Sequence, residues 1–151
     1  MKKIFLFLFL VACSFRPVFS ENDTDVFVAP ISGINGIELR NALNAKFGGV
    51  HDENAKYNLT VNLQAPITKY KALERTGGAT WQEVKLTASY VLKENNKIIA
   101  TGTESASESY TIVSYLVAAN ASYNNAVLNT INVLSDKIGM RVMTQTQKNQ
   151  N

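Results

Sequence analysis

The feature that most constrains the fold is an alternating stretch between residues 80 and 110, which predicts a β-hairpin. In its first half every second residue is apolar and the residues between are mostly lysine, serine or threonine; the apolar set is Val84, Leu86, Ala88, Tyr90 and Leu92. This period of two is typical of a strand with one buried face. Polar residues 94–97 then predict a tight turn, and a second β-rich run follows at residues 98–103. A hairpin alone is marginal in water, so another part of the chain must cover its apolar face.

A long amphipathic helix directly downstream provides that cover. Apolar residues recur every three or four positions over a stretch without proline: Tyr115, Ala119, Tyr123, Val127, Ile131, Leu134, Ile138 and Val142. We expect Leu134 and Ile138 to pack on the hairpin face that carries Leu86, Ala88 and Tyr90. Residues 144–151 are polar and predict a disordered tail.

Two more strands and a shorter helix precede the hairpin. Residues 26–30 are a short apolar run of β type, and residues 57–65 alternate between apolar and polar side chains. Between them, Leu39, Leu43 and Phe47 recur at intervals of four before a glycine pair, which predicts a helix with a glycine stop.

These elements predict an α+β fold in the order β-α-β-β-β-α. We expect a two-layer sandwich in which about four mostly antiparallel strands pack against two helices. The predicted organisation is a signal peptide at 1–12, an N-terminal tether at 13–24, a single domain at 25–143 and the disordered tail at 144–151. A chain of this length is large enough to bury one core.

The N-terminus predicts export and lipidation. Two lysines precede an apolar run at residues 4–12, which has the length of a secretory signal and is too short to span a bilayer. The run ends in Leu10-Val11-Ala12-Cys13, which resembles a bacterial lipobox, where the cysteine is acylated as the signal is removed. An ordinary signal peptide with an incidental cysteine is the alternative. We predict that Cys13 is the lipidated mature N-terminus.

Lipidation of Cys13 has two consequences. It is the only cysteine in the chain, so no disulfide stabilises the fold. Its acyl chains would hold the protein on a membrane without a transmembrane helix. Ser14 follows the cysteine, and by resemblance to bacterial lipoproteins a residue other than aspartate there favours sorting to the outer membrane.

The sequence holds no recognisable catalytic or metal-binding constellation. His51, the only histidine, lies in a charged loop and has no cysteine or carboxylate partner at a telling spacing, which predicts a surface residue. The net charge of +3 falls to +1 once Lys2 and Lys3 leave with the signal, so nothing indicates nucleic-acid binding. We therefore expect no enzyme activity and no cofactor.

A basic segment before the hairpin is the candidate ligand site. Lys69, Lys71 and Arg75 lie in residues 69–78, a stretch that predicts a glycine-ended loop with Glu74 as its only acid. Such a cluster suits a phosphorylated ligand, because an arginine fork binds phosphate through two hydrogen bonds. The alternative is a solvated loop without a ligand.

Several short motifs, in this order along the chain, resemble the lipopolysaccharide-assembly lipoprotein family LptE in its alphaproteobacterial form. They are Cys13 with Phe15-Arg16-Pro17, residues 38–43, Ala79-Thr80, residues 86–92, residues 135–138 and Arg141. The resemblance implies an outer-membrane, periplasm-facing lipoprotein that binds lipopolysaccharide and plugs the β-barrel LptD. It also implies that Arg75 stands where the family places a basic residue against lipopolysaccharide phosphate.

A second reading of function stays open at this point. A periplasm-facing lipoprotein of similar α/β build could bind another envelope protein, a peptide or a glycan without any barrel. Composition does not separate the two readings, because both need an anchor and a polar sheet face.

Overall fold

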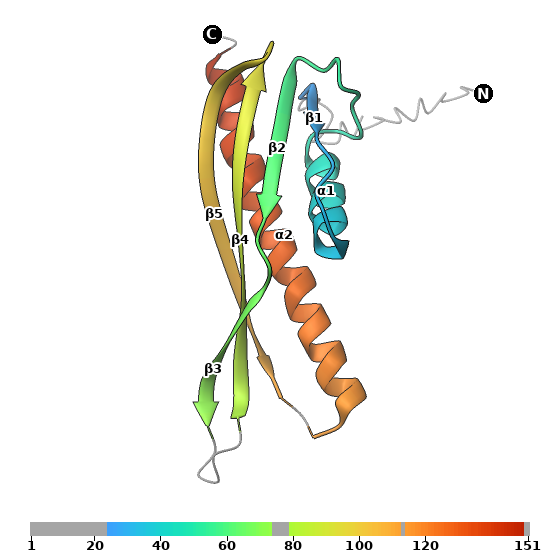
Figure 1. The fold of residues 1–151 in the computed structure, drawn as a ribbon, viewed down its shortest axis with the longest axis vertical. Helices are drawn as coiled ribbons and strands as arrows, with labels where there is room; N and C mark the ends of the chain where they lie inside the picture. Colours follow the sequence, from blue (N-terminus) through green and yellow to red (C-terminus); the bar gives the residue numbers. More distant parts are fainter. Residues whose placement is uncertain (1–23, 74–78, 113, 150–151) are drawn as a thin grey trace, which may run out of the picture.

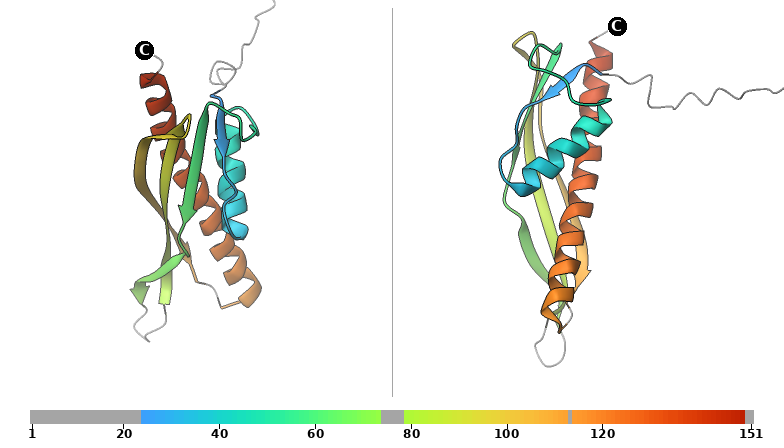
Figure 2. Two further views of the ribbon diagram at one scale, coloured as in Figure 1. Left: turned by 45° about the horizontal axis from the view of Figure 1, so that its top comes forward. Right: turned by 90° about the vertical axis from the view of Figure 1, so that its right-hand side faces the viewer.

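The structure, a computed structural model, describes residues 24–73, 79–112 and 114–149. Within these residues, one mixed sheet of five strands lies against two helices, both on the same face of the sheet (Figures 1 and 2). The elements are β1 (Val26–Val28), α1 (Ile34–Lys46), β2 (Tyr57–Leu63), β3 (Ile67–Leu73), β4 (Ala79–Glu94), β5 (Lys97–Thr111) and α2 (Leu116–Lys148). The predicted α+β class with two helices on a mostly antiparallel sheet is confirmed.

The sheet is organised around β4. One edge of β4 pairs antiparallel with β2 along residues 88–94 and then with β3 along residues 79–85. The other edge pairs antiparallel with β5 along residues 81–94. β1 extends the sheet by pairing in parallel with β2. β2 and β3 therefore share one edge of β4 in succession, joined by residues 64–66.

β3 corrects the prediction of a loop over residues 69–78. The structure has a strand through Leu73, so the chain holds one strand more than expected. The side chains of residues 67–72 are all exposed, and hence β3 has no buried face to give an apolar alternation. The backbone ladder with β4 holds it instead. Residues 74–78 lie outside the described residues.

The predicted hairpin is confirmed in its strands and in its turn. Asn95 and Asn96 have φ angles of 48° and 67°, the pair of left-handed conformations that a two-residue hairpin loop requires. Every apolar position of the alternating stretch is buried, with relative exposures of 7% or less: Val84, Leu86, Ala88, Tyr90 and Leu92. Leu134 and Ile138 of α2 belong to the same buried cluster, as expected.

The C-terminal ends of α1 and α2 compare differently with the prediction. Gly48 and Gly49, with φ angles of 91° and 139°, follow α1 and form the predicted glycine stop. α2 continues to Lys148, so residues 144–148 are helical where the sequence predicted disorder. Hydroxyls there bond back within the helix, and Thr146 is only 2% exposed. None of the described helices is long and apolar enough to cross a bilayer.

The two ends of the sheet are covered differently (Figure 1). The end of the molecule that contains β1, α1, β2 and the C-terminal half of α2 is called the proximal half. The distal half comprises β3, residues 79–85 of β4, 107–111 of β5 and 116–125 of α2. α1 packs on α2 and β1, so it lies in the proximal half and leaves the distal sheet to α2 alone.

Candidate functional site

The open face of the sheet carries the candidate site, because neither helix covers it (Figure 2, right). Even-numbered residues of β4 from Val84 to Leu92 point into the core, so the odd-numbered residues point to this open face. Lys85 of β4 is exposed there, opposite Ile67 of β3. Lys69 of β3 lies opposite Glu83 on the same face.

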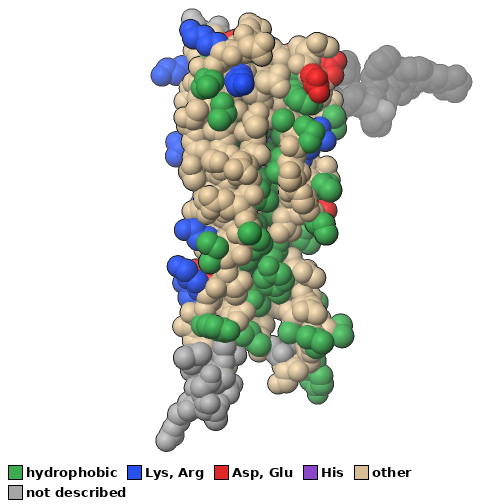
Figure 3. All heavy atoms as spheres, in the orientation of Figure 1, with side chains coloured by type: hydrophobic (Ala, Val, Ile, Leu, Met, Phe, Trp, Pro, Cys, Tyr) green, Lys and Arg blue, Asp and Glu red, His purple; other side chains and the backbone are tan. Residues whose placement is uncertain are grey.

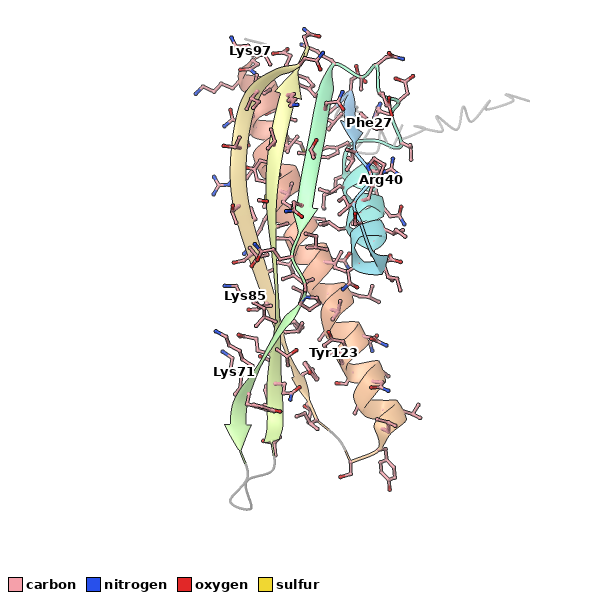
Figure 4. The ribbon with its side chains drawn as sticks, viewed as in Figure 1. Phe27, Arg40, Lys71, Lys85, Lys97 and Tyr123 are labelled. Atoms are coloured by element: carbon pink, nitrogen blue, oxygen red, sulfur yellow. The ribbon has the colours of Figure 1, made fainter. Side chains whose placement is uncertain are left out.

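Four lysines gather at this place, and we call Lys69, Lys71, Lys85 and Lys137 the lysine patch. Lys71 Nζ lies 3.0 Å from Glu83 Oε2. Lys137 reaches from α2 to the free edge of β5, where its Nζ donates a hydrogen bond of 2.7 Å to the Ser105 carbonyl. Figure 4 shows the Lys71 and Lys85 side chains pointing to the same side of the molecule.

The lysine patch borders a shallow hollow of about 440 Å³. Its lining combines three of the patch lysines with Glu83, Val133 and three small residues of β5, namely Ser105, Ala106 and Ser107. Glu83 is the one carboxylate in this lining, so positive charge is in clear excess. Ammonium donors beside hydroxyl groups suit an anionic oxygen ligand such as a phosphate. Three of the lysines are exposed, so salt will weaken any such contact.

The predicted site residues have different outcomes. Lys69 and Lys71 lie together as expected, but on strand β3 rather than in a loop. Arg75 and the predicted lipidation site Cys13 lie outside the described residues, so their roles stay predictions.

Sequence reasoning missed Lys85 and Lys137. Lys85 had a usable signal, because it occupies a polar position of the alternating stretch in β4. Lys137 had none, since its place in the patch depends on α2 passing the free edge of β5, a feature of the tertiary packing.

His51 has a structural role in the fold. Its Nε2 lies 3.1 Å from the Phe47 carbonyl oxygen, and its Nδ1 lies 3.5 Å from Asp25 Oδ1. The imidazole thus ties the end of α1 to the residue before β1. Among the described residues, no group of three or more histidine, cysteine or acidic side chains is placed to hold a metal ion.

Comparison with known proteins finds likeness in fold alone. No protein-family model and no curated protein matches the chain. A proposed lipoprotein from Caulobacter crescentus superposes with a TM-score of 0.67 at 16% identity, over 83% of this chain and 93% of that one. Rare lipoprotein B from Shewanella oneidensis superposes with a TM-score of 0.64 at 14% identity, over 82% of this chain and 96% of that one. For a minor lipoprotein from Acinetobacter baumannii the TM-score is 0.58 at 16% identity, over 82% of this chain and 93% of that one. The chain thus shares its fold with solved structures of bacterial lipoproteins.

Proposed function

We propose that the protein is an outer-membrane lipoprotein of the LptE type. In this role it plugs and stabilises an LptD-like β-barrel, contacts lipopolysaccharide and assists its transport to the outer leaflet. The observation that carries the proposal is the fold shared with lipoproteins over at least 82% of the chain in the three comparisons above. The lipobox-like Leu10-Val11-Ala12-Cys13 and the motifs that resemble LptE agree with it.

The lysine patch supports a direct contact with the lipid. Lipopolysaccharide carries phosphate groups, and a charge-assisted hydrogen bond from lysine or arginine is stronger than a neutral one. Lys69, Lys71 and Lys85 present their ammonium groups on an uncovered sheet face, where a large ligand meets no helix. Arg75 stands two residues after the end of β3 in the sequence, and its proposed phosphate contact rests on the resemblance to LptE.

The barrel partner is tested by purification from envelopes. The tagged, lipidated protein is extracted in mild detergent and isolated under conditions that keep membrane complexes intact. We expect one large outer-membrane β-barrel to copurify in equal amount. If a different envelope protein, or none, copurifies in stoichiometric amount, the plug role is wrong; a different partner would favour the alternative function of a periplasm-facing adaptor.

The ligand contact is tested by lipopolysaccharide binding at two salt concentrations. Each charge-assisted contact contributes about 1.5 to 3 kcal/mol, so Arg75→Glu and the double variant Lys69→Glu/Lys85→Glu should each weaken binding by at least about tenfold. Lys148→Glu, an exposed lysine at the far end of α2, is the matched control. Should the patch variants bind as tightly as the control, lipopolysaccharide is not held by this surface.

The anchor is tested on the mature N-terminus. Mass spectrometry should find Cys13 as the first residue, with acyl chains attached, and Cys13→Ala should leave the protein uncleaved or released from the membrane. An unmodified Cys13, or cleavage at another residue, would remove the basis for outer-membrane anchoring.

A further inference from the structure

The distal half exposes large apolar and aromatic side chains that the core does not use. At the start of α2, Tyr115, Leu116 and Val117 are 81%, 76% and 83% exposed. On β3 and β4 of the same half, Tyr70 and Trp81 are 69% and 51% exposed. Figure 3 shows hydrophobic side chains gathered at the lower right end, over the start of α2. Single exposed apolar residues are ordinary on soluble proteins, but a group at one end marks a contact site.

The start of α2 is also unusual as a helix end in water. Tyr115 occupies the N-cap position and makes no side-chain capping hydrogen bond, and the first turn holds no acidic residue. Serine, threonine, aspartate or asparagine normally stands at this position, because its side chain accepts from the free N–H groups. Here the first turn instead presents Leu116 and Val117 outward.

We propose that Tyr70, Trp81 and Tyr115–Val117, which we call the distal tip, insert into the interface of a phospholipid bilayer. Tryptophan and tyrosine favour this depth because their rings are apolar while one polar group stays hydrated. Leucine and valine at the exposed end of a helix can enter the acyl region of the bilayer while the rest of the fold stays unchanged. Lys69 and Lys71 flank Tyr70 in β3 and point to the opposite face of the strand, from where they add longer-range attraction to anionic headgroups.

Two other environments fit the distal tip less well. The lumen of a transmembrane β-barrel is polar, so in the proposed plug role the distal tip would lie outside the lumen. A second copy of the chain would have to meet a protruding helix end, whereas protein interfaces need closely complementary surfaces. The inference does not depend on the proposed barrel or on lipopolysaccharide.

The tip is also distinct from the predicted lipid anchor. α2 has 33 residues and is therefore about 50 Å long. Figure 1 places its C-terminal end at the same end of the molecule as β1, where the described chain begins, and its first turn at the opposite end. The distal tip would thus give the protein a second membrane contact far from the first described residue.

The chain contains its own probe for this contact, because Trp81 is its only tryptophan. The experiment uses the mature chain with Cys13→Ser, so that no acyl chain contributes; every residue of the buried core lies within residues 26–142 and is retained. The protein is mixed with vesicles of phosphatidylcholine, alone or with phosphatidylglycerol. We expect Trp81 emission to shift to shorter wavelength and to be quenched by brominated acyl chains, with tighter binding to the anionic vesicles.

Variants assign the effect to the tip. Leu116→Ser/Val117→Ser should weaken vesicle binding by about tenfold or more, because two apolar side chains no longer leave water. Leu128→Ser/Met140→Ser is the matched control on the same helix, with exposures of 44% and 61%, and should bind like the unchanged protein. Far-ultraviolet circular dichroism verifies that all forms hold the same helix content.

Four results would each overturn the proposal. They are an absent Trp81 response to vesicles, an equal loss in the control variant, a Trp81 shift that follows protein concentration without lipid, and a response that requires lipopolysaccharide in the vesicles. The third would assign the tip to self-association, and the fourth would assign it to the ligand site.

Discussion

The proximal and distal halves are built from the same strands and the same helix, yet only the proximal half has a deep core. Its fully buried side chains are large and come from both layers, among them Leu39, Leu43, Phe47, Tyr57, Leu92 and Ile138. In the distal half, Val84 is the one buried apolar residue among those the structure describes. Partly buried tyrosines replace aliphatic packing there; the rings of Tyr110 and Tyr123 meet edge to face with centroids 5.7 Å apart.

The cause of this difference is the position of α1. In the proximal half, β1 adds a strand to the sheet and α1 adds a second helix to the helical layer. The sides of the sheet and of α2 that face each other are therefore buried there. In the distal half, α2 crosses the sheet alone. Apart from Val84, the side chains described there are exposed or half-buried. The proximal half therefore supplies most of the stability, while the distal half is free to bind. Both the lysine patch and the distal tip lie in or next to that half.

The sharpest test of this division is a truncation in the proximal core. Leu134→Ala should lower the free energy of unfolding by roughly 2 to 5 kcal/mol, because Leu134 is fully buried between α2 and the sheet. Leu128→Ala, on the same helix but 44% exposed, is the control and should change it by about 0.5 kcal/mol or less. Urea denaturation measures both. A loss at Leu134 no larger than at Leu128 would mean that α2 does not pack on the sheet in this register.

The next test overfills the proximal core. Tyr90 lies opposite Gly102 in the β4–β5 ladder, and a Cβ on Gly102 would stand 2.7 Å from Tyr90 Cζ. Gly102→Val should therefore push the ring aside and cost about 1 to 3 kcal/mol. Ser107→Val on the exposed face of the same strand is the control and should be close to neutral. Equal thermal stabilities of the two variants would contradict close packing of Tyr90 on β5.

A smaller effect is expected in the distal half. The Tyr110 hydroxyl donates a hydrogen bond to Gln82 Oε1 from a half-buried position. Tyr110→Phe removes that bond and should cost about 0.5 to 1.5 kcal/mol, less than the core truncation. Tyr115→Phe, at an exposed position, should leave the urea midpoint unchanged. A loss at Tyr110 as large as at Leu134 would show that the distal half is as tightly packed as the proximal one.

The same division explains how far the sequence alone predicts the fold. β4, β5, their turn and most of α2 were predicted, because burial on one face leaves a regular pattern of apolar residues. β3 was missed because it has no buried face. Residues 144–148 were missed for a related reason, since Thr144 and Thr146 satisfy their hydroxyls on carbonyls within α2 and need no apolar periodicity.

The candidate site was predictable only in part. Lys69 and Lys71 are close in sequence, so their cluster is visible without a structure. Lys85 and Lys137 join them only through strand pairing and the passage of α2 along β5. Contacts between residues far apart in the chain depend on the topology of the fold, which short sequence motifs do not predict.

The last prediction compares the two halves by pH. Burial raises the pKa of Tyr90, with the nearby Glu104 carboxylate adding to the effect and Arg141 opposing it. Burial likewise raises the pKa of Tyr110. The folded protein thus keeps both phenols neutral to higher pH than the unfolded chain does, where tyrosine ionises near about pH 10. Their contribution to stability is full below that pH and is lost as the pH rises through the folded pKa values.

Stability should therefore fall above about pH 10, and each Tyr→Phe variant should lessen that fall, because phenylalanine has no proton to lose. Tyr90 is only 7% exposed in the proximal core, whereas Tyr110 is half-buried in the distal half, so Tyr90→Phe should lessen the fall more. Urea midpoints of the three proteins, followed from neutral pH to about pH 11, measure the difference, with Tyr115→Phe as the exposed control. If the urea midpoint falls equally steeply with pH in Tyr90→Phe and in Tyr115→Phe, the deep burial of Tyr90 is contradicted. The contrast between the two halves would then rest on aliphatic packing alone.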